Sequence, residues 1–519
     1  MNRHLVRAAE VTALRQKTRA IDEEPTVKVN ESIAKAAFYY EKLRNVIDYQ
    51  DEHLFLKNAI KRIIKRHRVF AANGIPEKLL RELVWAGYFE NNSLPTRYVE
   101  DIDQILKKYE FIKTNIGSKT LRRKKLNSVF SGLIACDIES LLSPAVSKEE
   151  FICFAKEIIK KNISLNPSEI GANELDIQID ISIERLLFMS DYDQIFFKLI
   201  GKSYDQWPDI TKEKARDLAS NFSRIYGLIN NSINQNKKSK IQKYVKKQLP
   251  VFLVLWNVIV SNRDPEGLLK SRSKVKELSK LFIESRNKEL VRKVMRALAR
   301  GVLFVLLTKT VFALLIEYPY ELKVLQEINY PALIINVSLP PIVLVIAGLF
   351  IKIPSGSNSE KLLRMVESVA FADTLPAKPL VSLSGKRSRN YVVYNTVYFL
   401  LSLAILVVVG WGLDKIHFNP VSIALFYMFV SLVSFLAFRT RATAKELEVE
   451  VSEDGLVAGV INFLLLPFVS IGKYLSDKWS EYNFTLFFWD FIVEAPFKTI
   501  ILVFESWLSF TREKREDFE

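Results

Sequence analysis

Lys309 is the residue whose type and position most clearly require a chemical explanation. It lies near the middle of an apolar run, between Thr308 and Thr310. A lysine at the centre of a membrane span costs about 2.5–3.5 kcal/mol, so its ammonium group should face a bundle interior, a water-filled cavity or a carboxylate. The two threonines can hydrogen-bond to the backbone of their own helix. We interpret Lys309 either as half of an internal ion pair or snorkelling group, or as part of a site for a substrate, proton or lipid headgroup.

The last apolar block, residues 484–510, carries further charge. At 100° per residue its ionisable side chains fall within a stripe about 80° wide. The stripe comprises Asp490, Glu494, Lys498 and Glu505. It can face a bundle interior or lie along lipid headgroups, and four ionisable groups in one span favour an interfacial or re-entrant helix. Asp490 and Glu494, together with Glu317, are the candidate partners of Lys309.

Pro340 and Pro341 interrupt the second apolar block, just after Asn336 and Ser338. Two prolines remove two backbone donors and bend a helix. The freed carbonyl groups can line a polar cavity inside a membrane, as in the broken helices of transporters. A plain kink or a helical hairpin is the alternative. Both prolines are therefore candidate members of an intramembrane polar site around Lys309.

Two basic clusters in the first 300 residues form a candidate surface for anionic lipid or a protein partner. One lies beside an apolar stripe and comprises Lys61, Arg62, Lys65 and Arg66. The other is a continuous run of Arg122, Arg123, Lys124 and Lys125. Such runs are usually solvated faces, but each basic residue near an anionic leaflet contributes about 1 kcal/mol of attraction. Nucleic acid or ribosome contact also fits the charge, yet no RNA-recognition aromatic motif, zinc finger or KH signature accompanies it.

Enzyme motifs are missing from the sequence. Residues 117–120 (Gly-Ser-Lys-Thr) end like a phosphate-binding loop but lack the earlier glycine and a preceding strand. The four histidines are scattered, without the His-Glu-x-x-His spacing. Cys136 and Cys153 are too few for a cysteine-rich zinc site and suggest a reducing compartment. We therefore expect no cofactor and favour a non-enzymatic role.

These residues lie in two halves of different character. Residues 1–300 contain 55 Lys and Arg against 37 Asp and Glu, whereas residues 301–519 contain 19 against 21. The first half shows helical periodicity, with one exception at residues 175–183, whose alternation of apolar and polar residues is typical of a strand or extended stretch. The apolar run 251–260 is too short to span a bilayer and predicts a buried helix, with a membrane-dipping segment as the alternative.

The second half contains six apolar blocks, of which the first four have the length of membrane spans. We therefore predict a mainly α protein, with a helical cytoplasmic domain followed by four to six membrane helices. The expected order is a loosely ordered segment (1–30), a basic helical domain (31–290), a basic-flanked hairpin of spans 1 and 2 (291–353), a loop (354–390), spans 3 and 4 (391–438), a second loop (439–455), two further membrane or interfacial helices (456–510) and a charged tail (511–519).

Loop charges give the expected orientation. The first span follows six basic residues between positions 286 and 300, which places its amino end in the cytoplasm. The loops 352–390 and 439–441 are also basic, whereas the loop after Tyr320 is acidic. The amino terminus lacks the apolar region of a secretory signal. We expect a multi-pass plasma (inner) membrane protein with both termini in the cytoplasm.

Two functions remain open from the sequence. In the first, the basic domain is a membrane-tethered docking or scaffold module for a protein partner or anionic lipid. In the second, Lys309, the two prolines and the charged stripe of the last block form the polar site of a transporter or membrane-insertion factor. The surroundings of Lys309 discriminate between them, because a carboxylate partner favours a structural role and a solvent-filled cavity favours transport or insertion.

Overall fold

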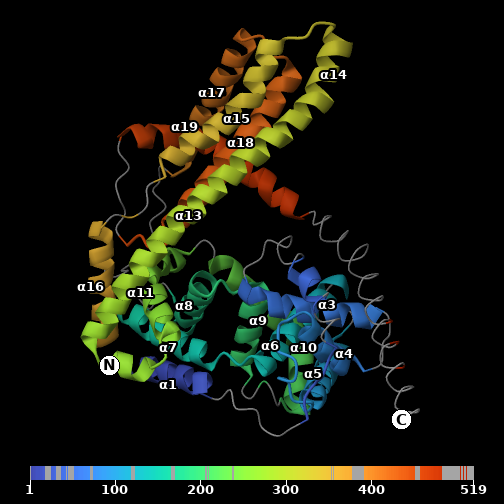
Figure 1. Cartoon of the computed structure of the whole chain (residues 1–519), viewed down its shortest axis with the longest axis vertical. Helices are drawn as coiled ribbons and strands as arrows, with labels where there is room; N and C mark the ends of the chain where they lie inside the picture. The colour runs from blue at the N-terminus through green and yellow to red at the C-terminus, as the bar shows by residue number, and fades with distance from the viewer. Residues whose placement is uncertain are drawn as a thin grey trace.

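The chain is mainly helical. The computed structural model describes residues 2–17, 25–30, 35, 37–42, 44, 52–69, 74–117, 123–164, 170–204, 207, 210–236, 239–351, 354, 356–376, 391–449, 456–481, 503, 507 and 510. Helices account for 84% of the structure, and the described ranges contain no strand beyond an isolated bridge between Thr26 and Pro95. The predicted mainly α fold is confirmed (Figure 1).

Six helices, together with one face of a helix described below, surround the first of two hydrophobic cores in the amino-terminal half. They are α3 (Phe55–Val69), α4 (Ile75–Trp85), α5 (Tyr98–Thr114), α6 (Arg123–Leu142), α9 (Tyr192–Ser203) and α10 (Lys212–Asn236). In α3, Ile60, Ile63 and Ile64 recur at helical spacing and are at most 2% exposed. The basic residues of the same helix lie beside this apolar stripe, so α3 has one face in the core and one face of charge.

The second core lies between α1 (Arg3–Lys17), α7 (Val146–Lys161), α11 (Lys240–Ser261), α12 (Pro265–Leu269), the start of α13 (Arg272–Phe312) and α16 (Gly356–Ala372). The apolar run 251–260 lies within α11, and its core-facing side chains are fully buried, as predicted. Asp264 caps α12 by accepting a hydrogen bond from the Gly267 amide (3.0 Å).

Two elements of this core differ from the sequence prediction. Residues 1–30 were expected to be loosely ordered, yet residues 3–17 form α1, and Leu5, Ala8 and Ala9 are 0% exposed in the core. Residues 354–390 were expected to be a loop, yet α16 packs against α11 and α13. Both helices are short and polar on one side. Their apolar stripes can therefore be recognised in the sequence only once the surface against which they pack is known.

The strand expected at 175–183 is wrong, because these residues lie within α8 (Ala172–Leu187). Alternate residues on a helix are separated by about 200°, so an alternating pattern gives a helix two opposite apolar faces. Ile181 lies in the first core, whereas Ile179 and Ile183 lie in the second. The period of two thus reflects a helix packed between two cores.

The carboxy-terminal half forms a bundle of long helices above this domain (Figure 1). Helix α13 continues through the wide turns η2 (Ala313–Glu317) and η3 (Glu321–Leu325), with α14 (Tyr318–Tyr320) between them, as one helix of 54 residues. The other bundle helices are α15 (Tyr330–Leu349), α17 (Tyr391–Lys415), α18 (Pro420–Ala444) and α19 (Leu456–Glu481). The long helix is therefore shared by the domain and the bundle.

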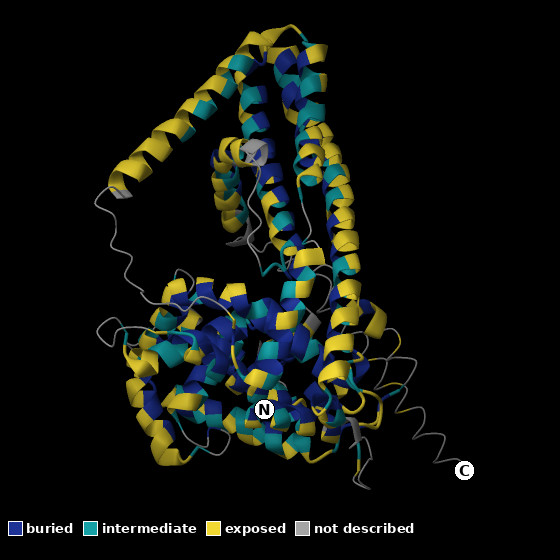
Figure 2. Ribbon diagram, turned by 90° about the vertical axis from the view of Figure 1, so that its left-hand side faces the viewer, coloured by how far each residue is buried: buried dark blue, intermediate teal, exposed yellow. Residues whose placement is uncertain are grey.

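Four described helices are long and apolar enough to cross a membrane: Arg272–Leu325, Tyr330–Leu349, Val392–Lys415 and Pro420–Ala444. The bent pair α6 and α7 also passes this test by length and composition, with 106° between the helices. We assign that pair to the domain, because Phe130 and Phe154 pack in its two cores. Helix α17 has none of its apolar window buried, and its amino-terminal end leans away from the bundle (Figure 2). Nearer its carboxy-terminal end, Leu413 packs in a core of the bundle.

Small residues fix the register of the bundle. A Cβ on Gly301 of α13 would lie 3.0–3.1 Å from Leu344 of α15 and Leu436 of α18. A Cβ on Gly348 would lie 2.7 Å from Leu298. Such close approach of helices at glycine is typical of membrane bundles. It places the end of α15 at the level of residues 297–298 of α13.

Two segments tie the bundle back to the domain. Arg286 of α13 forms hydrogen bonds to both carboxylate oxygens of Glu446, at 2.8–3.1 Å. The amide of Asn358 in α16 donates to the Leu447 carbonyl (2.8 Å) and accepts from the Val449 amide (2.9 Å). Leu447 itself is 0% exposed in the second core. The loop predicted at 439–455 is thus docked on the domain over residues 446–449.

Candidate polar site in the helical bundle

Lys309 is buried inside the bundle and paired with a carboxylate. Its side chain is 0% exposed, and its ammonium group donates to Oε1 of Glu317, which is also 0% exposed. The Nζ atom lies 5.2 Å from the centre of the Phe429 ring on α18, within range of a cation–π interaction. Glu317, one of the three carboxylates suggested as partners, therefore lies beside Lys309.

The geometry of the helix explains how residues eight positions apart can pair. At 100° per residue, Glu317 would be turned about 80° from Lys309. The turn Ala313–Glu317 is of the wider π type, which rotates less per residue and brings Glu317 closer to the face of Lys309. Pro319 lies two residues beyond this turn and lacks the backbone N–H that a regular helical turn would use.

Neighbouring helices complete the environment of Glu317. Its Oε2 atom accepts hydrogen bonds from Asn336 Nδ2 of α15 (2.7 Å) and Ser422 Oγ of α18 (3.2 Å). The Asn336 amide also donates to the Ser422 carbonyl (3.3 Å). Both neighbours of Nδ2 are acceptors, so the orientation of the amide is fixed by its partners.

Glu321, one turn beyond Glu317, makes a second set of contacts. It is 3% exposed and accepts from the Asn329 amide (3.1 Å) and from Asn419 Nδ2 (2.8 Å). Asn329 and Asn419 are the N-caps of α15 and α18, bonding the amides of Ala332 (3.1 Å) and Ser422 (2.8 Å). Glu321 therefore joins the starts of two helices. We call Glu317, Glu321 and these donors the carboxylate latch.

Charge in the latch is close to balanced. Two carboxylates face one ammonium group and two helix N-termini, each of which carries about half a positive charge. No cation beyond Lys309 is needed to account for the two glutamates. Within the described residues, no group of three or more His, Cys, Asp or Glu side chains could hold a metal ion. The arrangement can fasten helices together, and its one unpartnered polar atom is Asn336 Oδ1, in a residue that is 0% exposed.

The other residues predicted for this site lie around it or outside the description. Thr308 and Thr310 donate to carbonyl groups of their own helix, those of Phe304 (2.7 Å) and Leu306 (2.8 Å), as the sequence suggested. Pro340 and Pro341 are buried within α15, about one turn after Asn336, and the helix continues past them. Asp490, Glu494 and Lys498 lie outside the described residues.

Glu321, Asn329, Asn419 and Ser422 were missed by the sequence analysis. Asn419 immediately precedes a proline, and Asn329 precedes one by two positions. In both cases the proline begins an apolar block, and this pattern is an N-cap signal. Glu317 and Glu321 lie four residues apart and so share a helix face. The sequence therefore contained the pattern for these contacts. It was missed because the acidic residues in 317–325 predicted a loop after the first span, whereas residues 317–325 continue its helix.

Three of the eight residues of the predicted basic surface form ion pairs inside the domain. Lys61 pairs with Asp193 at 2.5 Å, Arg62 pairs with Glu41 at 2.5 Å, and Arg66 pairs with the buried Glu82. The remaining members have varied surroundings. Lys65 and Arg123 are exposed, Lys125 lies 5.1 Å from the Tyr226 ring centre, and Arg122 and the Lys124 side chain lie outside the described residues.

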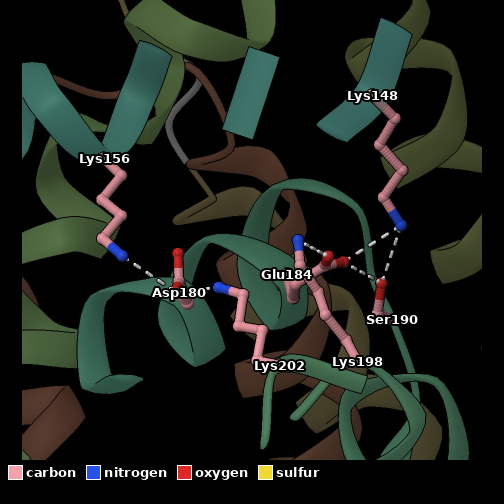
Figure 3. A network of polar contacts seen from close by, with 7 residues as sticks. All are labelled: Lys148, Lys156, Asp180, Glu184, Ser190, Lys198 and Lys202. Atoms are coloured by element: carbon pink, nitrogen blue, oxygen red, sulfur yellow. Dashed lines mark hydrogen bonds and ion pairs between the residues drawn. The ribbon is translucent and has the colours of Figure 1, made fainter. Parts of the chain in front are cut away.

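A second buried polar network joins α7, α8 and α9 in the domain (Figure 3). Two carboxylates of α8, Asp180 and Glu184, are 4–5% exposed. Lys156 (3.2 Å) and Lys202 bond Asp180, while Glu184 is bonded by three donors: Lys148 (3.0 Å), Lys198 (2.6 Å) and Ser190 (2.7 Å). Burial alone raises the pKa of Glu184, but Lys198 and Lys148 outweigh it and lower that pKa to about 2. The network stabilises a helix that could not otherwise bury two carboxylates.

The domain also has a cavity of about 760 Å³ between α5, α6 and the start of α10. Two of its charged lining residues pair with each other, since Lys108 bonds Asp137 at 2.5 Å and also lies 5.2 Å from the Trp207 ring centre. Burial raises the pKa of Asp137, and Lys108 lowers it only in part. A ligand here would have to displace an ion pair that is already formed.

Comparisons of the chain with protein-family models, with curated proteins and with solved structures found no match. The function is therefore argued from the packing and polar contacts of this chain.

Proposed function

We propose that this protein is an integral membrane protein whose helical domain is a non-enzymatic docking module, held in a fixed orientation at the membrane surface. The observation that carries the proposal is the connection between domain and bundle. A single helix of 54 residues belongs to both. A flexible linker would let the domain move relative to the bundle, whereas a continuous helix fixes the orientation of the domain relative to the bundle.

Two further contacts support a rigid connection. Helix α16 lies between two bundle helices in the chain, yet its buried side chains belong to the second core of the domain. The bidentate pair of Arg286 and Glu446 and the two hydrogen bonds of Asn358 add polar contacts of defined geometry. Three segments from different parts of the bundle thus meet the domain.

The same contacts support the proposed topology. The domain, α16 and residues 446–449 lie at one end of the bundle, and the carboxylate latch lies at the other (Figure 1). This grouping agrees with loop charges, which assign the amino-terminal half and both basic loops to the cytoplasm. We therefore propose a multi-pass plasma (inner) membrane protein with a cytoplasmic domain.

Photo-crosslinking in intact membranes tests the docking function. A photoreactive residue would replace Tyr39 (70% exposed) or Leu228 (60% exposed) on the domain of the full-length chain. We expect defined protein adducts from the domain positions. The matched control is Trp411 of α17 (64% exposed), which should react with lipid. If positions around the whole domain yield lipid or no adduct, the docking proposal fails.

A second candidate function, a transporter or membrane-insertion factor, is favoured by one observation. Asn336 is 0% exposed, yet its Oδ1 atom has no hydrogen-bond partner, although it adjoins the Lys309–Glu317 pair. Such an acceptor could serve a passing polar group. Asn336→Leu removes the acceptor. Unchanged growth of cells that depend on this protein, with unchanged protein levels, would rule out this function.

A further inference from the structure

Four basic side chains of α13 form a stripe between the domain and the bundle. They recur every four residues and are all exposed: Lys288, Arg292, Arg296 and Arg300. Successive members lie about 6 Å apart along the axis and turn by about 40°, so they occupy one side of the helix. We call these four residues the neck stripe.

The positive charge of the neck stripe is not neutralised by ion pairs within the part of the chain that the structure describes. None of its four side chains forms an ion pair with a described residue. Two nearby glutamates have other partners, because Glu289 pairs with Arg286 (2.7 Å) and Lys293 (2.8 Å) and Glu446 pairs with Arg286 (2.8 Å). A third glutamate, Glu284, is exposed four residues before Lys288, and no ion pair joins these two described side chains. The basic residues of α3 differ, since most of them are neutralised within the domain.

The stripe reaches the level at which the apolar bundle ends. Gly348 contacts Leu298, so α15 ends beside residues 297–298 of α13. The side chains that follow Gly348 at the end of α15, Leu349 and Phe350, are 79% and 41% exposed. From Arg300 to Glu317 the helix rises about 25 Å, which is close to the thickness of a bilayer core. Tyr318 and Tyr320 follow at the far end, where aromatic residues mark an interface.

An apolar edge accompanies the charge. Val291 (43% exposed) and Met295 (62% exposed) lie beside the stripe on the same part of α13. Basic residues next to exposed apolar ones match a lipid surface, where phosphate groups adjoin acyl chains. Arginine is suited to this role because its guanidinium group can bind phosphate through two hydrogen bonds.

We propose that the neck stripe binds the phosphate groups of anionic phospholipids at the domain side of the membrane. This inference rests on the proposed membrane function. It places the lipid-binding surface on α13 rather than on the cluster at 61–66, because Lys61, Arg62 and Arg66 form ion pairs inside the domain and the four stripe residues form none with a described residue. Lipid bound there would hold the domain at a fixed height above the bilayer.

The test uses the full-length protein in non-ionic detergent, titrated with phosphatidylglycerol or phosphatidylcholine, with bound lipid counted by native mass spectrometry. Wild type should bind phosphatidylglycerol selectively. Replacing all four stripe residues by Gln should weaken that binding by about 100-fold or more, since each residue adds to the attraction. The control replaces four exposed basic residues of the domain by Gln: Lys65, Arg123, Lys161 and Lys246.

Equal loss in both variants, or no preference of wild type for phosphatidylglycerol, overturns the proposal. Competition by millimolar inorganic phosphate would also overturn it, in favour of a site for soluble anions. If the fourfold variant does not fold, the test is made on wild type at high salt. About 1 M NaCl should abolish its preference for phosphatidylglycerol if the lipid binds a surface-exposed stripe, and a preference that persists would overturn the proposal. A wild-type protein that is soluble without detergent would instead contradict the membrane function itself.

Discussion

Lys309 shows how one charged residue can be structural inside an apolar bundle. Its position and Glu317 as a candidate partner could be predicted from the sequence, but the contact between the two could not. That contact depends on the wide turn Ala313–Glu317, which changes the rotation of the helix between the two residues. Such local changes of helical twist have no signature in residue spacing, because spacing assumes a constant rotation per residue.

Removing one member of the Lys309–Glu317 pair should destabilise the bundle far more than removing both. Lys309→Met leaves a buried, unpaired carboxylate and is expected to cost about 3–5 kcal/mol. The double variant Lys309→Met/Glu317→Gln should recover most of that loss. Thermal unfolding in detergent measures both, with Thr308→Val as a near-neutral control. Additive effects of the two single changes would show that the pair does not interact.

Glu184 should contribute stability that depends on pH. Its pKa is about 2 in the fold and 4.5 as an ordinary glutamate, so its contribution is complete above about pH 4.5 and is lost as pH falls towards 2. That contribution is on the order of 3 kcal/mol. Glu184→Gln should lower stability at pH 7 and flatten its decline between pH 5 and 3.

The exposed Glu289 provides the comparison for Glu184. Its pKa is also about 2, because of hydrogen bonds from Lys293 and Arg286, but its side chain is 38% exposed. Solvent screening limits such pairs to about 0–1 kcal/mol. Denaturant unfolding of Glu289→Gln between pH 3 and 7 should follow wild type closely. A similar pH effect in both variants would mean that burial is not what makes the α8 network stabilising.

At the scale of helices, hydrophobic periodicity predicted where most helices lie better than it predicted what each helix packs against. The runs in α3 and α11 gave the correct faces, since one stripe of each meets one core. The pattern in α8 was misread as a strand, because two opposite stripes on a helix and one face of a strand give the same alternation. Helices α1 and α16 escaped notice because they complete a core whose other walls lie far away in sequence.

The crossing of α19 and α18 should depend on a single glycine. A Cβ on Gly472 would lie 2.0 Å from the Ser431 carbonyl oxygen, whereas nothing lies within 4 Å of one on Gly459. Gly472→Ala is therefore expected to destabilise the bundle by about 1–3 kcal/mol through overpacking. Gly459→Ala, in the same helix, should be neutral. Equal melting temperatures for the two variants in detergent would show that the helices do not cross at this point.

For the whole molecule, the domain does not end where composition suggested. The expected boundary at residue 290 follows the change from charged to apolar sequence, but the second core includes Leu362, Met365 and Val366 of α16 and Leu447. Composition shows which residues are apolar. It does not show which apolar surfaces pack together when other helices lie between them in the sequence. The candidate membrane helices were predictable for the opposite reason, because length and hydropathy alone define them.

A chain truncated after residue 290 should fail to form a stable domain. It lacks several fully buried side chains, each worth about 1.5–3 kcal/mol, and the total loss is similar to the stability of a typical domain. We expect binding of hydrophobic dye and rapid proteolysis. Adding residues 356–376 through a flexible linker should restore protection. If the truncated chain instead melts cooperatively and resists protease, α16 is dispensable to the core.

The late position of α16 and Leu447 in the chain also imposes an order on biosynthesis. Residues 3–290 leave the ribosome first, yet the surface that closes their second core follows only after spans 1 and 2, and Leu447 only after α18. Domains usually fold as soon as they are synthesised. On the proposed membrane topology, the nascent domain keeps an apolar face uncovered until the first hairpin has entered the bilayer. That topology couples membrane insertion to completion of the domain, and it predicts that a delay at the insertion machinery appears as aggregation or chaperone capture of residues 3–290.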